Sequence, residues 1–545
     1  MHDGIHLSAN IFLPEDHGRF PTVLVRTPYG KGIDLVPNWQ ALVDRGYAVM
    51  VEDVRGRYES EGAFAPFTQE PPDANDTLNW IARQSWSDGK VGMTGGSYLG
   101  ITQWKAALTG NPHLKAIFPV VSGYDDYFDR FYSTGGAMKL GNRLEWMSEN
   151  LRAPGYRVDF TSFVRHLPLR TADIAATGLT SEMFQTALNH PTYDAFWRSV
   201  STREQLSKVK VPVFAIGGWY DNFAESDLAA YSELSKRSSV NRILIGPWPH
   251  NMSKHFEGID YGPDSEVPVR DLVIDWFDQW LMGKDTPLNS QPPVQIFLMG
   301  ANHWVESRTW PPEGSQVESW YLGSGGSANT LNGDGALNDA LPSPKHAGAP
   351  ADHFVYNPRD PVPTRGGSVC CNPEVFPWGP MDQREIEQRN DVLVYTSKSL
   401  AHDLQVAGPV SVQLYITTTA RDTDFTAKLV DVYPDGTARN LTDGILRLRY
   451  RNSLDKAELA APGTVYPVTV DAGVTGNVFR KGHKIRLEIS SSNFPRFDRN
   501  PNTGKPIVDE THLLSATQTI LHDAAHVSRL DLTVIRPKRE ATLQH

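Results

Sequence analysis

Cysteine and long apolar runs are scarce in this 545-residue chain. The two cysteines, Cys370 and Cys371, are adjacent. Because neighbouring cysteines rarely pair, we expect free thiols, which suit a reducing compartment. No apolar run reaches the length of about 18 residues that a membrane span requires. The N-terminus has no basic region followed by an apolar stretch, so the sequence predicts a cytoplasmic protein without membrane partners.

Signatures of cofactor, metal and nucleic-acid binding are also missing. There is no Cys-x-x-Cys, no His-Glu-x-x-His and no glycine-rich phosphate loop, so we expect no metal and no cofactor. The net charge is −11 and no strongly basic stretch occurs, which disfavours nucleic acid as a partner. What is present is an ordinary globular composition, 40% hydrophobic, in a chain long enough for about three domains.

The pattern along the chain divides it into three kinds of region. Residues 1–124 and 206–312 alternate strand-like and helix-like segments, which predicts a mostly parallel sheet covered by helices. Residues 125–205 are helix-like and rich in aromatic residues and Arg, and are interpreted as an inserted helical cap. Residues 313–545 alternate apolar and polar positions over many short runs, which predicts a β-sandwich domain. Around the start of that span, residues 311–350, rich in Gly, Ser, Asn and Pro, are predicted to be a linker or long loops.

Residues 90–104 have the pattern of a strand, a tight turn and a helix, with Ser97 at the turn. Gly95 removes the clash that a side chain would cause where such a turn projects a nucleophilic hydroxyl. The following helix aims its N-terminal dipole at negative charge that develops during attack. The usual pattern has its second Gly two residues after the Ser, but here that position is Leu99 and the glycine is Gly100. The alternative is a glycine-rich turn with a helix-capping serine.

A serine nucleophile requires a base and a carboxylate that orients it, each at the end of a later strand in an α/β hydrolase sheet. Asp221 follows a strand predicted to end at Gly217, and His250 follows one predicted to end at Gly246. Two alternatives remain open: Asp221 as the cap of the next helix, and His255 as the base in place of His250.

Several motifs carry a resemblance that extends over nearly the whole chain. They are Arg-Thr-Pro-Tyr-Gly at 26–30, Gly-Gly-Ser-Tyr-Leu-Gly at 95–100, Gly-Gly-Trp-Tyr-Asp at 217–221, Gly-Pro-Trp-Pro-His at 246–250, Asp-Thr-Asp-Phe-Thr-Ala-Lys-Leu-Val-Asp at 422–431 and Ser-Ser-Ser-Asn-Phe-Pro at 490–495. In these motifs the chain resembles the CocE/NonD hydrolases, whose relatives include X-prolyl dipeptidyl peptidases and α-amino-acid ester hydrolases.

The resemblance implies an α/β hydrolase core with an inserted helical cap and a C-terminal β jelly-roll domain. It implies Ser97 as nucleophile, His250 as base and Asp221 as the residue that orients the base. It also implies an oxyanion hole made from the Tyr98 backbone N–H and the Tyr29 hydroxyl.

The same resemblance suggests a pocket for an aromatic acyl group. Residues at the matching positions are Phe131, Tyr132 and Trp146 in the cap, Phe223 in the core and, only loosely, Val369, Cys370 and Cys371 in the jelly roll. Because thiols are smaller than the bulky residues expected there, the acyl site is predicted to be wider.

The sequence therefore favours a serine carboxylesterase whose partner is a small ester with a hydrophobic or aromatic acyl group. The alternative is an amidase or acylase of the same family: an α-amino-acid ester hydrolase, a β-lactam acylase or an X-prolyl dipeptidyl peptidase. Amino-ester enzymes place acids just after the catalytic Asp, where this chain has Phe223 and Ala224. A third hypothesis is a non-catalytic binding protein, because jelly rolls often bind sugars. Monomer and homodimer both remain open.

Overall fold

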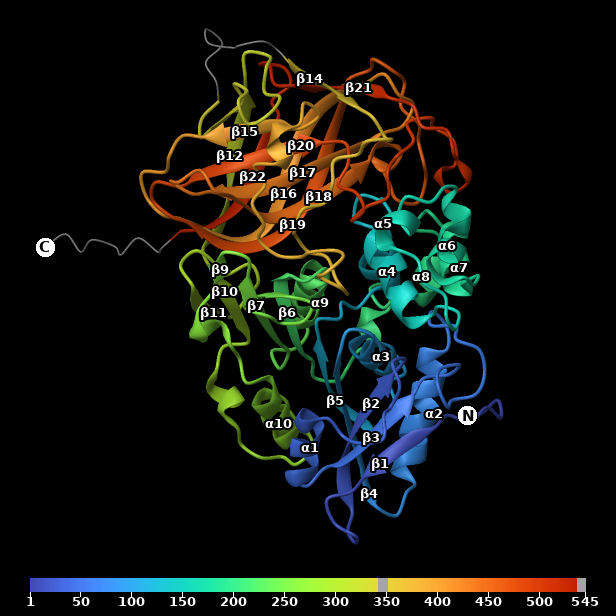
Figure 1. Cartoon of the computed structure of the whole chain (residues 1–545). Helices are drawn as coiled ribbons and strands as arrows, with labels where there is room; N and C mark the ends of the chain where they lie inside the picture. Colours follow the sequence, from blue (N-terminus) through green and yellow to red (C-terminus); the bar gives the residue numbers. More distant parts are fainter. Residues whose placement is uncertain (342–350, 537–545) are drawn as a thin grey trace, which may run out of the picture.

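A mostly parallel sheet forms the lower part of the molecule in the computed structural model, which describes residues 1–341 and 351–536 (Figure 1). The described strands follow the order β1-β3-β2-β4-β5-β6-β7-β10-β11. Only β1 and β11, at the two edges, pair antiparallel with their neighbours. Their bounds are β1 (Ala9–Phe12), β2 (Phe20–Thr27), β3 (Ala48–Asp53), β4 (Ser87–Gly96), β5 (Leu114–Val120), β6 (Phe214–Tyr220), β7 (Arg242–Pro249), β10 (Val294–Leu298) and β11 (His303–Ser307).

Helices cover both faces of this sheet. They are α1 (Pro37–Asp44), α2 (Glu70–Ala82), α3 (Tyr98–Ala107), α9 (Ala224–Ser235) and α10 (Val269–Trp280). Leu42 of α1 and Trp276 of α10 belong to the apolar cluster on one face. Leu78 of α2, Trp104 of α3 and Leu234 of α9 belong to the cluster on the other. Two covered faces explain why the central strands are near-continuous apolar runs. The predicted α/β hydrolase core is confirmed.

Between β5 and β6 the chain is helical and packs around its own aromatic core. The elements are the π-helix η1 (Asp126–Phe131) and the helices α4 (Leu140–Asn150), α5 (Phe160–Phe163), α6 (Ala172–Thr177), α7 (Glu182–Asn189) and α8 (Ala195–Val200). Asp194 caps α8 by accepting from the backbone N–H groups of Phe196 and Trp197. Figure 1 places this cap beside the sheet and below the β-rich part.

The C-terminal half is almost entirely β-structure, in agreement with the predicted jelly roll. Its described strands are β12 (Ser315–Gly323), β13 (Ala336–Asn338), β14 (Ala351–Tyr356), β15 (Leu393–Ser397), β16 (Leu404–Thr418), β17 (Asp424–Val432), β18 (Ala438–Arg447), β19 (Tyr466–Phe479), β20 (Lys484–Ser490), β21 (Ala516–Leu521) and β22 (Arg529–Ile535). A small separate hairpin, β8 (His255–Phe256) and β9 (Ile259–Asp260), precedes α10.

The prediction of a linker or loops over residues 311–350 is wrong for the part that contains β12 and β13. β12 pairs along its length with β22, and its Trp320 and Leu322 are buried. The partner strand is more than 200 residues away in sequence, so local composition gave no sign of it. Residues 342–350 of that predicted stretch lie outside the described residues.

The jelly roll shares one hydrophobic core with the last strands of the first sheet. Trp219 of β6 and Phe297 of β10 pack in the same cluster as Phe425 of β17. The Trp219 indole donates to the Phe297 carbonyl at 2.7 Å, and the Tyr220 hydroxyl donates to the Asn440 carbonyl of β18 at 3.1 Å. The end of β6 is thereby fixed from both sides.

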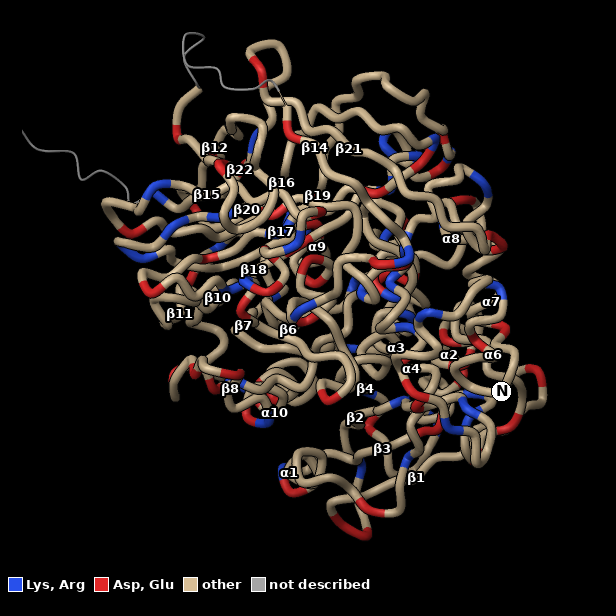
Figure 2. Tube along the Cα trace, turned by 45° about the horizontal axis from the view of Figure 1, so that its top comes forward, with Lys and Arg blue, Asp and Glu red and all other residues tan. Residues whose placement is uncertain are grey.

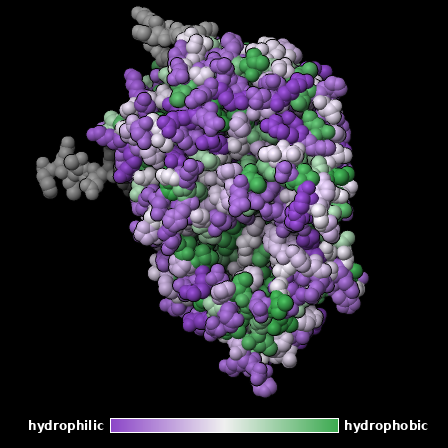
Figure 3. Space-filling model, in the orientation of Figure 1, coloured by the Kyte–Doolittle hydropathy of each residue, from purple (hydrophilic) through white to green (hydrophobic). Residues whose placement is uncertain are grey.

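The surface mixes charges of both signs. Figure 2 shows Lys and Arg interspersed with Asp and Glu over the described chain. On the face seen in Figure 3, hydrophobic side chains gather mainly in the lower half, over the sheet and its helices, while the jelly roll above is mostly hydrophilic. Among the described residues, every helix is too short or too polar to cross a membrane.

Candidate active site

Ser97 lies at the sharp turn between β4 and α3. Its backbone has φ 57° and ψ −125°, a left-handed conformation that non-glycine residues rarely adopt. Its N–H is held by the Val120 carbonyl of β5 at 2.9 Å. Although Ser97 occupies the cap position of α3, its side chain makes no capping bond, so the alternative role as a helix-capping serine does not hold. The strained turn is the conformation that exposes a nucleophilic hydroxyl.

The two glycines of the turn are required by close contacts. A Cβ on Gly95, whose φ is +134°, would lie 2.6 Å from the Leu99 Cβ. A Cβ on Gly100 would lie 2.3 Å from the Ser122 Cβ at the end of β5. A glycine is therefore required at position 100, one residue later than in the usual pattern, because α3 meets Ser122 just after β5 at this position.

Gln103 holds this turn from behind, a role that the sequence analysis did not assign. Its buried side-chain amide donates to the carbonyls of Gly95 and Leu99, both at 3.1 Å, and accepts from the Phe118 N–H at 2.9 Å. The sequence feature that could have indicated this role is a polar amide in the middle of a helix whose residues are all buried.

Asp221 and His250 form a hydrogen-bonded pair at the ends of neighbouring parallel strands. Asp221 follows the last residue of β6 and His250 follows the last residue of β7, and the distance from His250 Nδ1 to Asp221 Oδ1 is 2.8 Å. The Asp221 side chain is fully buried, whereas His250 keeps 17% of its side chain exposed. A donor role for Nδ1 leaves Nε2 as the free acceptor.

Neither alternative role for these residues is found. α9 starts only at Ala224 and has no side-chain cap. His255 is exposed on β8 and faces Asp260 at 3.4 Å.

Ser97, Asp221 and His250 all follow the carboxyl ends of strands in the run β4-β5-β6-β7, so they share one edge of the sheet. Within the described residues, the Ser97 hydroxyl makes no hydrogen bond. It is only partly buried and remains open to a substrate.

Tyr29, Trp146 and Tyr98 form an aromatic wall that joins the core to the cap. The Tyr29 hydroxyl accepts from the Trp146 indole N–H at 3.1 Å, which leaves its own proton free to donate elsewhere. The Trp146 ring stacks on Tyr98, with centroids 6.3 Å apart and planes 11° apart. The Tyr98 backbone N–H lies in the first turn of α3, where no intrahelical acceptor is available. Two donors are thus available near the Ser97 turn.

A buried charged network holds the Tyr98 side chain in place. Its hydroxyl donates to Glu70 at 2.8 Å, and Arg26 pairs with Glu70 at 2.7 Å and with Glu52 at 2.6 Å. Burial, together with Glu70, raises the pKa of Tyr98 well above its ordinary value, so the hydroxyl stays a donor. Arg26 is the first residue of the motif at 26–30. The sequence alone did not indicate that it pairs with Glu52 and Glu70.

The predicted pocket residues separate into two groups. Trp146 contacts Tyr29 and Tyr98 as described, and the Phe223 ring lies 5.7 Å from the His250 ring. Phe131 is fully buried against Phe67 and Trp197, and the Arg143 guanidinium lies over both the Phe131 and Trp146 rings. Tyr132 is also buried in the cap, where its hydroxyl donates to the Ala187 carbonyl at 2.8 Å.

Cys370 and Cys371 are joined by a disulfide, so the prediction of free thiols is wrong, and its support for a reducing compartment is lost. The chain turns sharply here because Cys371 has a φ of 92°, a conformation the sequence did not reveal. The Cys370 N–H donates to the Asn142 side chain at 3.2 Å, one helical turn from Trp146 on α4. Cys370 therefore borders the helix that carries the aromatic wall, rather than the Ser97 turn itself.

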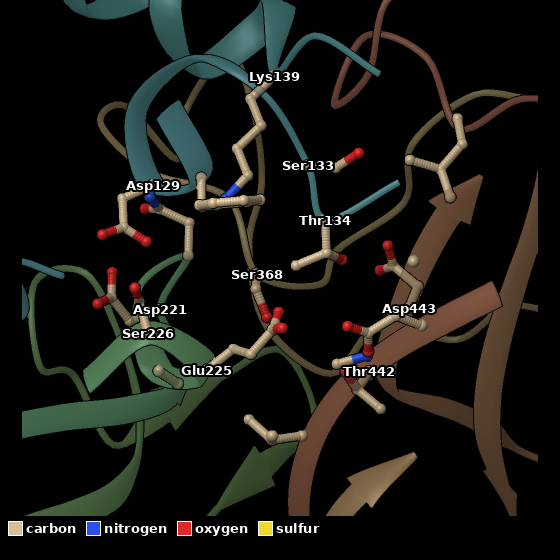
Figure 4. Close-up of a pocket in the computed structure, with 18 of the residues that line it drawn as sticks. Asp129, Ser133, Thr134, Lys139, Asp221, Glu225, Ser226, Ser368, Thr442 and Asp443 are labelled. Carbon is tan, nitrogen blue, oxygen red and sulfur yellow. The ribbon is translucent and has the colours of Figure 1, made fainter. Parts of the chain in front are cut away.

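A polar cavity of about 60 Å³ lies behind Asp221, where core, cap and jelly roll meet (Figure 4). In that view Lys139 extends from the cap toward Asp129, while Glu225 points toward Ser368 and Asp443 approaches from the jelly roll. Burial and the nearby Asp471 raise the pKa of Glu225 to about 8. Burial lowers the pKa of Lys139, and Asp129 and Glu225 oppose that shift. The cavity places three cations, Lys139, Arg203 and Arg496, among acids that include Asp221.

Several polar atoms at this cavity have no hydrogen-bond partner among the described residues. They are Arg203 Nε, Asp221 Oδ2, Asn222 Oδ1 and Ser226 Oγ. A space of this size with four such groups meets the requirements of buried water. Among the described residues, no group of three or more His, Cys, Asp and Glu side chains is arranged to hold a metal ion.

Comparison with known protein families gives two matches that together span most of the chain. Residues 3–252 match the X-Pro dipeptidyl-peptidase (S15 family) model. Residues 288–531 match the X-Pro dipeptidyl-peptidase C-terminal non-catalytic domain.

Individual relatives extend over nearly the full length. Cocaine esterase from Rhodococcus sp. (strain MB1 Bresler) is 36% identical over 566 residues, which cover 98% of this chain and 97% of that protein. Among solved structures, an α-amino acid ester hydrolase has a TM-score of 0.84 at 26% identity. An aminopeptidase from the marine sediment archaeon Thaumarchaeota archaeon has a TM-score of 0.84 at 25% identity. Each of these two similarities covers 98% of this chain and 95% of the solved chain.

Proposed function

This chain belongs to the CocE/NonD family of serine hydrolases, and from this premise we propose that it is a carboxylesterase acting on small esters with a hydrophobic or aromatic acyl group. The observation that carries the proposal is the Asp221–His250 pair, at 2.8 Å, on the sheet edge where the β4–α3 turn projects Ser97. Base and nucleophile at one sheet edge are what acyl transfer by a serine requires.

The proposed reaction has two halves. Ser97 Oγ attacks the ester carbonyl carbon while His250 Nε2 takes the hydroxyl proton. His250 then gives that proton to the departing alcohol oxygen, which leaves an acyl group on Ser97. Water attacks the acyl-enzyme by the same route and releases the carboxylic acid. Asp221 holds the imidazole through Nδ1 and stabilises the positive charge that forms on it.

Two donors are proposed to stabilise the oxyanion of each tetrahedral intermediate. One is the backbone N–H of Tyr98 in the first turn of α3. The other is the hydroxyl of Tyr29, whose oxygen is already occupied by the Trp146 indole and whose proton is free. Donors fixed in advance act on the charge as it develops and need no reorganisation during the reaction.

The preference for a neutral acyl group is supported by the walls of the site. Phe223 lies beside His250 at a ring distance of 5.7 Å, and Trp146, in the cap helix α4, packs against Tyr29 and Tyr98 next to the Ser97 turn. Aromatic faces of this kind favour an apolar or aromatic acyl group. The relative that shares 36% identity bears the name cocaine esterase, which also fits an ester with an aromatic acyl part.

The second candidate function is hydrolysis of α-amino-acid esters or amides, which the names of two structural neighbours favour. Acids do lie near Asp221, in the polar cavity. However, Lys139, Arg203 and Arg496 also line that cavity, and burial with the nearby Asp471 raises the pKa of Glu225, which weakens that carboxyl as a partner for a cation. The cavity therefore already supplies its acids with cations of the chain itself, which disfavours a substrate ammonium there.

Paired substrates distinguish the two candidates. We expect a phenylacetyl ester to be hydrolysed with a higher kcat/KM than the matching phenylglycyl ester, which differs by one ammonium group. The phenylacetyl amide with the same leaving-group skeleton tests bond type separately. Faster turnover of the phenylglycyl ester, or of amides over esters, would contradict the proposal.

A further inference from the structure

A second cavity lies between the cap and the jelly roll, away from the Ser97 site. It has a volume of about 240 Å³, and none of Ser97, Asp221, His250, Tyr29 or Trp146 lines it. The cap side of its wall includes Tyr132, Met138, Leu169 and Leu188, and the jelly-roll side includes Tyr450, Ile507 and Val508. We propose that this cavity binds a compact, neutral, one-ring organic molecule that carries a single hydrogen-bonding group.

The size and polarity of the wall set the class of ligand. An apolar cavity of about 150 Å³ holds a benzene molecule, so about 240 Å³ accommodates a ring with a short substituent. Leu169 and Leu188 are almost fully buried at its base, while Pro191, Ala457 and Pro506 at the rim are exposed. The cavity is therefore apolar inside and reachable from solvent, which is the usual form of a small-molecule site.

Its charged residues are already paired and disfavour a charged ligand. Arg447 pairs with Asp424 and with Asp498, each at 2.9 Å, and Arg449 pairs with Asp422 at 2.7 Å. An anionic ligand would have to displace a buried carboxylate from its guanidinium. A cationic ligand would approach two guanidinium groups. A neutral molecule has neither cost.

Two hydroxyl groups in the wall, those of Tyr450 and Thr192, make no hydrogen bond within the described part of the chain, whereas the Tyr132 hydroxyl is occupied by the Ala187 carbonyl. Tyr450 is buried and Thr192 is half-buried. The Tyr450 ring is held in place because it packs against Gly136, which has no side chain to displace it. Tyr450 is thus a fixed, buried hydrogen-bonding group in a wall whose charged residues are already paired.

This site is separate from the proposed esterase reaction. Met138 lines the apolar cavity, and the next residue, Lys139, lines the polar cavity behind Asp221. The two cavities lie on opposite sides of one cap segment, and the binding test below does not depend on ester hydrolysis.

Fluorine NMR of the full chain with 4-fluorobenzyl alcohol and 4-fluorotoluene as probes tests the proposal. We expect both probes to bind the wild-type protein, as seen by line broadening that saturates with concentration. Val508→Trp, which places a large side chain at the half-buried rim, is expected to abolish binding of both. Val317→Trp, on an exposed β12 position, and Trp146→Ala, in the wall of the Ser97 site, are expected to keep it.

A second variant decides the matter if Val508→Trp does not fold. Tyr450→Phe removes only the hydroxyl and is expected to weaken the alcohol about fivefold while leaving 4-fluorotoluene unchanged. Absence of binding to the wild-type protein would overturn the proposal. So would binding that survives Val508→Trp in a folded protein, binding lost in Trp146→Ala, or an alcohol affinity unchanged in Tyr450→Phe.

Discussion

Tyr29→Phe is the substitution that separates catalysis from folding most cleanly in this chain. It removes one oxygen, the hydroxyl that accepts from the Trp146 indole at 3.1 Å and is proposed to donate to the oxyanion. The ring and its edge contact with Trp146, at a centroid distance of 6.4 Å, remain. The Trp146 N–H lies in a half-buried position where water can replace the lost acceptor.

The two consequences differ in size. Loss of one hydrogen bond in the folded protein costs about 1 kcal/mol of stability. Loss of one oxyanion donor lowers kcat by roughly 10²–10³, because that donor acts on negative charge that develops in the transition state. We therefore expect a protein with nearly unchanged thermal stability and a kcat at least about a hundredfold lower.

Tyr98→Phe is the matched control, since it removes the same atom from the neighbouring aromatic residue. Its hydroxyl donates to buried Glu70 at 2.8 Å, so the expected cost is stability, about 1–3 kcal/mol. The proposed oxyanion donor of Tyr98 is its backbone N–H, which the substitution keeps. Its kcat is expected to stay within about threefold of wild type.

The assay is steady-state turnover of p-nitrophenyl phenylacetate, with kcat and KM measured separately and active sites counted by titration. Thermal unfolding of each variant is recorded alongside. An unchanged kcat in Tyr29→Phe would refute the oxyanion role. Equal losses of kcat in both variants would show that the aromatic wall acts only through packing.

Three further predictions follow from the same geometry. Gly100→Ala places a Cβ 2.3 Å from that of Ser122 and should destabilise the protein by about 1–3 kcal/mol and lower kcat. The Gly100→Ala/Ser122→Gly double variant should recover part of both losses. No recovery would contradict this contact as the cause. Gln103→Leu leaves the Phe118 N–H unpaired and loosens the Ser97 turn, so kcat and unfolding free energy should both fall, and a fall in neither would contradict the role of Gln103. Burial raises the pKa of Glu225 from 4.5 to about 8, so the stability this group contributes is present below pH 4.5 and is lost as the pH rises through about 8. Glu225→Gln should flatten that loss by about 1–3 kcal/mol in urea unfolding across roughly pH 5 to 9; identical pH dependence in both proteins would contradict it.

The sequence was sufficient to propose the order of the site residues along the chain. It did not indicate how far the strands before Asp221 and His250 extend. The strands before Asp221 and His250 were predicted to end at Gly217 and Gly246, because glycine and proline are typical of turns. In the structure β6 and β7 run on to Tyr220 and Pro249. The jelly roll packs on Trp219 and Tyr220 at the end of β6, and Trp248 near the end of β7 packs in the cluster that contains α10. No local pattern could indicate either contact.

The surroundings of the proposed pocket residues were harder to predict than the turn that carries Ser97. A strand–turn–helix with glycine at Gly95 is a local signal, because the steric demand lies within a few residues. Phe131 and Tyr132 are aromatic residues of a helical cap, and whether they face a substrate or the cap interior depends on how the whole cap packs. Here both are buried among cap residues, and Tyr132 also lines the cavity between cap and jelly roll. Likewise the Cys370–Cys371 disulfide depends on one left-handed residue that composition does not reveal.

The central claim is that Ser97 is the nucleophile of a serine hydrolase. Intact-protein mass spectrometry after treatment with a fluorophosphonate tests it most directly. We predict one phosphonyl adduct per chain, mapped to Ser97 by peptide analysis, and neither adduct nor esterase activity in Ser97→Ala. An adduct that persists in Ser97→Ala, or a wild-type protein that hydrolyses esters without labelling at Ser97, would contradict it.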